Sequence, residues 1–280
     1  MLNFHRINNL TGWLAFLIAM VTYTLTVEPT ASFWDCGEFI ACAYKLQVPH
    51  PPGAPLFLLI GRMFSLLALG DVSRVAFWVN MMSVVSSALT ILFLHWTIVL
   101  IGRKILNKTF DSLTKSESII LLLSGFIGAL VYTFSDSFWF NAVEAEVYAM
   151  ATLFIALLFW LGLRWEQDMN TPRGNRWLLL ISLIVGLSFG VHFMALLTIP
   201  AIGFLYFFKN YKTVTFKNFI IANVVVVAVL LFIFKLLLPL TMAFFGKAEI
   251  FMVNSLGLPF DSGTIFVILL LIAFFYYGIK

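Results

Sequence analysis

The composition of the chain excludes a water-soluble globular protein. Of its 280 residues, 62% are hydrophobic and 11% are charged, whereas about 25% of the residues of soluble domains are charged. The formal net charge of +4 does not indicate nucleic acid as a partner, because in a membrane protein the placement of Lys and Arg matters more than their sum. We therefore expect an all-α, multi-pass integral membrane protein with a single membrane domain over residues 1–280.

Apolar runs separated by turn signals predict eight membrane spans. We interpret the first run as an uncleaved span, because it is long for the apolar part of a secretory signal and is followed by Glu28 and Pro29 rather than by small residues. Cys36 and Cys42 lie on different faces of a helix, so we expect no disulfide between them. In chain order the predicted spans are 10–27, 75–101, 118–135, 147–163, 177–191, 193–208, 218–238 and 263–279.

The basic residues predict which loops face the cytoplasm. Loops 164–176 and 209–217 each carry three Lys or Arg residues, and cytoplasmic loops are enriched in these residues. Because an even number of spans must separate two loops on the same side, we interpret residues 177–208 as a hairpin of two short helices that turns at His192. This scheme places His192 on the outer side, together with most of the loop carboxylates.

Segment 28–74 is the longest stretch outside the predicted spans, and yet it is largely apolar. This composition predicts helices that lie in the membrane interface, near residues 35–45 and 55–69. Three prolines surround His50, and they disfavour a helix and predict a rigid turn over residues 48–52. We expect this outer loop to carry the chemistry.

Asp35 and Glu38 are the leading candidates in this loop. They are three residues apart and would share one face of a helix, and a glycine between them leaves room for a close approach. The pair suits a general base or an acid that orients an acceptor. The structural alternative is helix capping, or an ion pair with Lys45 or Arg62.

The other outer candidates are His50, Glu146 and His192. The proline frame of His50 would hold its side chain in place, although a turn residue that only bonds backbone would have the same surroundings. In loop 135–149, Glu144 and Glu146 point to different faces of a helix, so at most one addresses the same cavity as the first acids, and we favour Glu146. His192 lies at the tip of the hairpin, whose short helices suggest a cavity within the membrane.

Three strings of the sequence carry a family resemblance: FWDCGEFIACAYKLQVPHPPGAPLF, FWFNAVEAEVYAM and GLSFGVHFMALLTIP. In this order they resemble the protein O-mannosyltransferase-like transmembrane family, which has many bacterial members, over most of residues 1–208. The resemblance implies the multi-span helical bundle of C-type glycosyltransferases, with the interfacial helices in the first outer loop. Members usually continue with further spans and a soluble region, so we expect the N-terminal part of a longer protein or a short form.

The resemblance also implies roles for the candidate residues. Asp35 and Glu38 are expected to be the catalytic acids, with Asp35 as our candidate base; in the better-known protein O-mannosyltransferases the two acids are adjacent, so which of the pair is the base stays open. We expect Arg62 and Arg74, with Lys247 as an outsider, to bind a phosphate. The remaining outer candidates, His50, Glu146 and His192, are expected to bind substrate or acceptor.

The predicted function is transfer of a hexose, mannose-like, from a polyprenyl-phosphate carrier to an acceptor outside the cytoplasm, either a protein Ser/Thr hydroxyl or a glycan. The leaving phosphate is already a stable anion, so a base and a cation suffice, and we expect inversion. Besides the lipid-linked sugar and membrane lipid, we expect no obligatory cofactor. Several carboxylates converge, which leaves a divalent metal open, but no ligand set has diagnostic spacing and we expect no obligatory metal. We expect a bacterial inner membrane rather than endoplasmic reticulum.

Two alternatives belong to other functional classes. A transporter or flippase of lipid-linked sugars would place charged residues at mid-membrane and break its spans in two corresponding halves. A non-catalytic membrane scaffold would bind the sugar carrier without turnover. Most ionisable residues fall in the predicted outer loops, with Lys235 as the main exception, which favours the enzyme.

Overall fold

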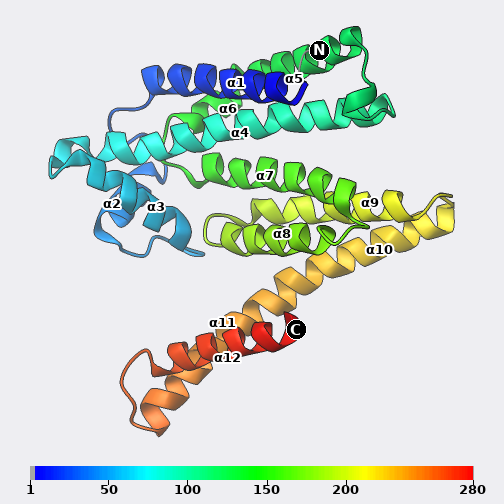
Figure 1. The fold of residues 1–280 in the computed structure, drawn as a ribbon. Helices are drawn as coiled ribbons and strands as arrows, with labels where there is room; N and C mark the ends of the chain where they lie inside the picture. Colours follow the sequence, from blue (N-terminus) through cyan, green and yellow to red (C-terminus); the bar gives the residue numbers. More distant parts are fainter. Residues whose placement is uncertain (1–3, 280) are drawn as a thin grey trace. The chain divides into compact units, whose positions relative to one another are not determined.

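The computed structural model describes residues 4–279, and every regular element in this part of the chain is a helix. Six helical segments are long and apolar enough to cross a membrane, so the chain is a multi-pass membrane protein, as its composition predicted. The α-helices in chain order are α1 (Phe4–Thr26), α2 (Cys36–Lys45), α3 (Pro55–Ser65), α4 (Val75–Ile105), α5 (Lys115–Thr133), α6 (Asp136–Ala142), α7 (Val147–Asp168), α8 (Gly174–Ser188), α9 (Thr198–Asn210), α10 (Phe216–Phe232), α11 (Leu238–Ile250) and α12 (Ser262–Ile279) (Figure 1).

Helices cover all eight predicted spans. One of the six long segments joins the turn after α8 to α9 (Phe193–Asn210). The apolar helices Gly174–Ser188 and Ser262–Tyr277 are shorter than these six, so the number of crossings stays a prediction. Within the described residues the chain forms two compact units, of which the first ends at Lys212 and the second begins at Thr213. The single membrane domain over residues 1–280 likewise stays a prediction.

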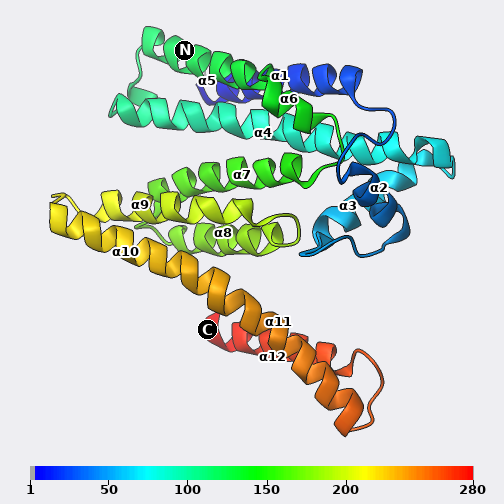
Figure 2. The same ribbon diagram turned by 180° about the vertical axis from the view of Figure 1, so that it is seen from behind.

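α4 is the central helix of the first unit. α1 and α5 pack on one side of it and α7 on another, and both Figure 1 and Figure 2 show α4 between them. Small side chains such as Ser83, Ser87 and Ala88 are fully or almost fully buried along α4, and small residues let apolar helices approach closely. α4 therefore sets the two ends at which the loops gather.

The first outer loop folds into α2 and α3, which pack on the start of α4. Phe39 and Phe57 are buried there together with Val79 and Met82 of α4, and the helix bounds agree with the predicted 35–45 and 55–69. A side chain in place of Gly61 would meet Ala43 at 2.9 Å, so the two helices require glycine at this contact. Buried apolar contacts thus fix the loop against the bundle.

The hairpin predicted over residues 177–208 is present. α8 ends at Ser188, a 3₁₀ turn covers Phe193–Leu197, and α9 follows. The carbonyl of Gly190 accepts hydrogen bonds from the backbone N–H groups of Leu56 and Phe57, at 2.7 and 3.1 Å. The turn therefore lies against the start of α3, at the same end as the first outer loop.

The basic helix ends also meet, as the charge pattern predicted. Nζ of Lys104 lies 3.2 Å from a carboxylate oxygen of Glu166, and Nζ of Lys209 lies 3.5 Å from the other. These residues come from α4, α7 and α9. We call this end of the first unit the inner end, and the end with α2 and α3 the outer end.

Two elements differ from the sequence-based expectation. The predicted loop 135–149 contains the short helix α6, because Phe138 and Ala142 are buried against α1 and α4 and draw the segment into a turn of helix. In the second unit, helix continues from Phe216 to Ser255 through π turns at Ile233–Leu237 and Phe251–Ser255. The first π turn precedes Pro239. Proline has no backbone N–H to donate, and a local π turn lets the carbonyls freed in this way find other donors.

Candidate active site

Glu38 and His50 form the best-defined polar contact at the outer end. One carboxylate oxygen of Glu38 accepts the backbone N–H of His50 at 2.7 Å, and the other lies 2.8 Å from its Nδ1. The side-chain hydrogen bond from His50 lowers the pKa of the Glu38 carboxyl, and the same bond raises the pKa of the His50 imidazole. The pair therefore favours a carboxylate with an imidazolium, and Glu38 fixes the proline turn to α2.

Asp35 completes this group from the N-cap position of α2. Its carboxylate oxygen lies 4.0 Å from Nε2 of His50, which is too far for a direct hydrogen bond. Its side chain makes no capping hydrogen bond and is 54% exposed. A third atom placed between Asp35 and Nε2 can lie within hydrogen-bond reach of both.

Glu146 approaches the same group from the residue before α7. It is buried, and it accepts a hydrogen bond from the thiol of Cys36 at 3.7 Å. Burial raises the pKa of Glu146, and the negative charge of Asp35 adds to the rise. We call Asp35, Glu38, His50 and Glu146 the outer cluster.

Three residues that the sequence analysis did not select support the outer cluster. Burial raises the pKa of the Cys36 thiol to about 12, so it stays a protonated donor to Glu146. Asn80 of α4 is fully buried, and its Nδ2 donates to the backbone carbonyls of Glu28 and Thr30. In the sequence, Asn80 is an isolated amide within an apolar span, and this pattern could have indicated a polar contact that anchors the loop.

The third residue is Trp34, which precedes Asp35 and has a φ of 64°. Positive φ is costly for a bulky residue and is most often seen where function requires it. Its ring is 89% exposed, and that of Phe33 is 88% exposed. Two aromatic faces are thus presented beside the acids.

Glu144, the other glutamate of the predicted loop 135–149, has a different partner from Glu146. Glu144 is buried and accepts a hydrogen bond from the hydroxyl of Ser32 at 2.7 Å, whereas Glu146 faces Cys36. The two residues lie in the bend between α6 and α7, not on a helix. Their different directions come from extended backbone at Glu146.

His192 lies at the outer end but caps a helix. Its Nδ1 accepts the backbone N–H of Met194 at 3.1 Å, and its ring lies 5.5 Å from that of Tyr148. Burial lowers the pKa of His192, which favours a neutral ring with its proton on Nε2. His192 thus lies beside α7 and makes no described polar contact with the side chains of the outer cluster.

The two arginines expected to bind phosphate are engaged elsewhere. The guanidinium of Arg62 donates to the backbone carbonyl of Tyr44 at 2.7 Å and lies over its ring. Arg74 forms an exposed ion pair with Asp71 at 3.4 Å. Neither makes a hydrogen bond or ion pair with the described side chains of the outer cluster, so the arginine roles stay predictions.

The outer cluster includes atoms that suit a divalent cation. Asp35, Glu38 and His50 each offer one ligand atom, and these atoms lie within 4.8 Å of one another. Carboxylate and imidazole ligands fit several divalent ions. However, Nδ1 of His50 is already bonded to Glu38, so only Nε2 is available without breaking that contact. The expectation that no metal is required stays a prediction.

Comparison with known proteins matches this part of the chain. The family model described as the protein O-mannosyl-transferase TMEM260 N-terminal domain matches residues 35–215, a segment that contains every candidate residue named above except Lys247. A protein O-mannosyl-transferase tmem260 of Dictyostelium discoideum is 27% identical over 208 residues, which cover 70% of this chain and 23% of that protein.

A second relative is the protein O-mannosyl-transferase TMEM260 of Mus musculus, which is 30% identical over 152 residues, covering 54% of this chain and 19% of that protein. The matched region thus spans less than a quarter of the length of either relative. No solved structure matches the chain.

Proposed function

Because the chain belongs to the family of the protein O-mannosyl-transferase TMEM260 N-terminal domain, as its motifs predicted, we propose that it is a membrane glycosyltransferase that modifies proteins. It would move a hexose, mannose or a close relative, from a polyprenyl-phosphate carrier to a Ser or Thr hydroxyl. The names of both relatives support the class of reaction. The carrier, the side of the membrane and the stereochemistry are our proposals.

The single observation that carries the proposal is the arrangement of Asp35, Glu38 and His50. Glu38 holds the imidazole through Nδ1, so Nε2 is directed to the open side where Asp35 lies 4.0 Å away. A hydroxyl oxygen between them would donate its hydrogen to Asp35 and lie near His50. Holding a reacting group in this way is a large part of catalysis.

The reaction then balances without a general acid. As the acceptor oxygen bonds to the anomeric carbon, its proton passes to Asp35, and the bond from that carbon to the phosphate oxygen breaks. The phosphate leaves with the bonding electrons as a stable anion, and attack from the opposite face inverts the anomeric centre. Glu38 and His50 would position the acceptor, and Glu146 would lie beside them at the start of α7.

A cation for the leaving phosphate completes the proposal. Arg62 and Arg74 are the arginines of the first outer loop. Arg62 uses Nη1 for the Tyr44 carbonyl, and its remaining N–H groups can donate to phosphate. The exposed rings of Phe33 and Trp34 offer apolar surface to the sugar, the acceptor or the lipid.

The proposed side of the membrane is the outer one, because the basic helix ends gather at the opposite end of the first unit. The sequence predicted a bacterial inner membrane, and both relatives named above are eukaryotic. The multi-pass character does not depend on which membrane it is.

The test is the substitution Asp35→Asn in membranes that contain the protein, with a radiolabelled polyprenyl-phosphate hexose as donor and secreted proteins as acceptor. We expect transfer to fall at least about 100-fold, the usual contribution of general base catalysis. Asp136→Asn is the matched control, because Asp136 is an exposed carboxylate in the first turn of α6 and has no described contact with the outer cluster or with either arginine. Equal activity of Asp35→Asn and the unchanged protein would remove Asp35 from the reaction.

A further inference from the structure

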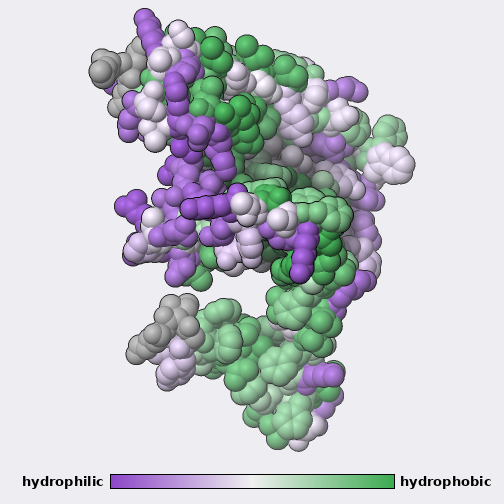
Figure 3. Space-filling view, turned by 90° about the vertical axis from the view of Figure 1, so that its right-hand side faces the viewer, coloured by the Kyte–Doolittle hydropathy of each residue, from purple (hydrophilic) through white to green (hydrophobic). Residues whose placement is uncertain are grey.

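A cavity lies at the inner end of the first unit, at the opposite end of α4 from the outer cluster. Its volume is about 440 Å³, and polar residues at the ends of α4, α7 and α9 and in the loop after α4 line it. Figure 3 looks onto this end, and hydrophilic residues gather on the face that it shows. The residues that matter for its chemistry are Arg103, Lys104, Lys108, Glu166, Gln167 and Lys209.

The cavity carries an excess of positive charge. Four of these six residues are cations and one is an anion. Glu166 is 8% exposed, and it accepts contacts from both Lys104 and Lys209. A single carboxylate shared by two lysines leaves one positive charge over, and Arg103 adds another.

Hydrogen-bond donors in the wall of the cavity lack an acceptor. Nε of Arg103 and Nε2 of Gln167 are enclosed, and no hydrogen-bond partner reaches them among the described residues. Buried donors are nearly always bonded in folded proteins. Arg103 and Gln167, which bear these donors, both line the cavity, so its wall has hydrogen-bonding capacity that no described residue uses.

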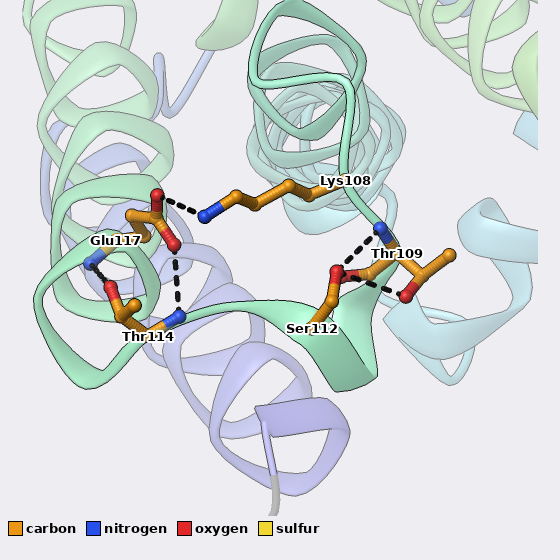
Figure 4. Close-up of polar contacts among 5 residues, drawn as sticks. All are labelled: Lys108, Thr109, Ser112, Thr114 and Glu117. Atoms are coloured by element: carbon orange, nitrogen blue, oxygen red, sulfur yellow. Dashed lines mark hydrogen bonds and ion pairs between the residues drawn. The ribbon is translucent and has the colours of Figure 1, made fainter.

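The loop after α4 holds the cationic side chains in place. Lys108 donates to Glu117 at 2.7 Å, and Glu117 in turn accepts the backbone N–H of Thr114, as Figure 4 shows. Ser112 and Thr109 bond one another across the same loop. Arg103 lies over the ring of Phe110 at 5.1 Å. The loop is thus built before any ligand arrives.

We propose that this cavity binds the phosphate of an anionic phospholipid headgroup. A phosphate carries negative charge and several acceptor oxygens, which match the surplus cations and the unused donors. The cavity lies at the ends of membrane-spanning helices, where headgroups lie, and basic pockets between helices at the cytoplasmic side are typical lipid sites. This role is independent of the reaction proposed for the outer cluster.

Native mass spectrometry of the full chain in detergent tests the proposal, with phosphatidylglycerol titrated against phosphatidylcholine. Near a membrane surface each Lys or Arg contributes about 1 kcal/mol to anionic lipid binding, or about fivefold in affinity. We expect Arg103→Gln to weaken phosphatidylglycerol binding about fivefold and Arg103→Gln with Lys108→Gln about 25-fold. Lys104 and Lys209 are left intact, because their removal would strand Glu166.

Arg173→Gln is the matched control, because Arg173 is exposed in the loop after α7 and does not line the cavity. Thermal unfolding of each variant shows whether the fold is retained. Equal lipid affinity of the double variant and Arg173→Gln, with both folded, would overturn the proposal. Release of phosphatidylglycerol by inorganic phosphate at similar concentration would keep an anion site and reject the lipid as its occupant.

Discussion

The carboxylates at the two ends of the first unit have different partners. At the inner end, Glu166 contacts Lys104 and Lys209, and Glu117 contacts Lys108. Each of these glutamates therefore has a lysine that compensates its charge. Such pairs tie helix ends together.

At the outer end the described partners of the carboxylates are an imidazole, a hydroxyl and a thiol rather than lysines. Glu38 is bonded to His50, whereas Glu144 and Glu146 accept from a serine hydroxyl and a cysteine thiol. Asp35 has only the imidazole 4.0 Å away. None of these four carboxylates has a described contact with a lysine or an arginine. The described carboxylates of the inner end thus join helix ends, whereas those of the outer end are the candidates for the proposed reaction.

The largest expected effect is a loss of hexose transfer on substitution of Glu38, and it tests whether the outer carboxylates serve the proposed reaction. In Glu38→Ala the imidazole and the proline turn lose both of their contacts with α2, so the acceptor would be misplaced. We expect hexose transfer to fall about 100-fold, measured with the labelled donor. Glu28→Ala is the control, because the described hydrogen bonds of the Glu28 side chain go only to Thr30. Similar losses in both variants would assign Glu38 a general structural role.

The next effect concerns the inner end. Lys104→Gln with Lys209→Gln leaves Glu166 buried without a cation, and breaking a buried pair is costly even when its lysines are partly exposed. We expect a loss of about 2 kcal/mol in the free energy of unfolding, measured in detergent with a denaturant. Adding Glu166→Gln should recover most of the loss. No recovery in the triple variant would show that the lysines act separately.

A smaller effect tests the contact between the hairpin turn and α3. In Gly190→Ala the new methyl group would meet Cβ of Leu56 at 2.7 Å, whereas at Gly186 nothing lies within 4 Å. We expect Gly190→Ala to cost about 1.5 kcal/mol through overpacking. Gly186→Ala, inside α8, should instead stabilise by a few tenths of a kcal/mol or more. Thermal unfolding of both variants decides, and equal melting temperatures would argue against the contact.

The smallest effect is a change of protonation. The hydrogen bond to Glu38 raises the pKa of His50 above its usual 6.5, so Glu38→Gln should lower that pKa, measured by nuclear magnetic resonance of labelled histidine. The stabilising effect of His50 is complete below pH 6.5 and is lost as pH rises through its raised pKa. That of Glu38 is complete above pH 4.5 and is lost as pH falls through its lowered pKa. Between pH 4.5 and pH 6.5 both groups therefore contribute fully to stability. An unchanged His50 pKa in Glu38→Gln would refute the hydrogen bond as the cause of the raised pKa.

Much of the fold was predictable because hydropathy reports depth in the membrane. All eight predicted spans are helical, both helices of the first outer loop have nearly the predicted bounds, and the hairpin turns at His192. Basic residues also predicted that the ends of α4, α7 and α9 lie together. Hydropathy could not predict α6, since its formation depends on where Phe138 is buried.

The side-chain partners were harder to predict. Spacing placed Asp35 and Glu38 on one face, yet the bond from Glu38 to His50 joins residues twelve apart and depends on the exact path of the proline turn. The link between Cys36 and Glu146 depends on packing between α2 and the start of α7. No local pattern in the sequence contains that information.

The long helix from Phe216 to Ser255 has a consequence of its own. Forty helical residues extend about 60 Å, twice the thickness of the hydrocarbon layer. An upright crossing would leave half of this apolar helix in water, so it must tilt strongly or bend at its π turns. Glu249 of α11 accepts backbone N–H groups of Asp261 and Thr264, so α12 is held against the second half of this helix. The tilt of the long helix is therefore coupled to the placement of α12 in the same bilayer.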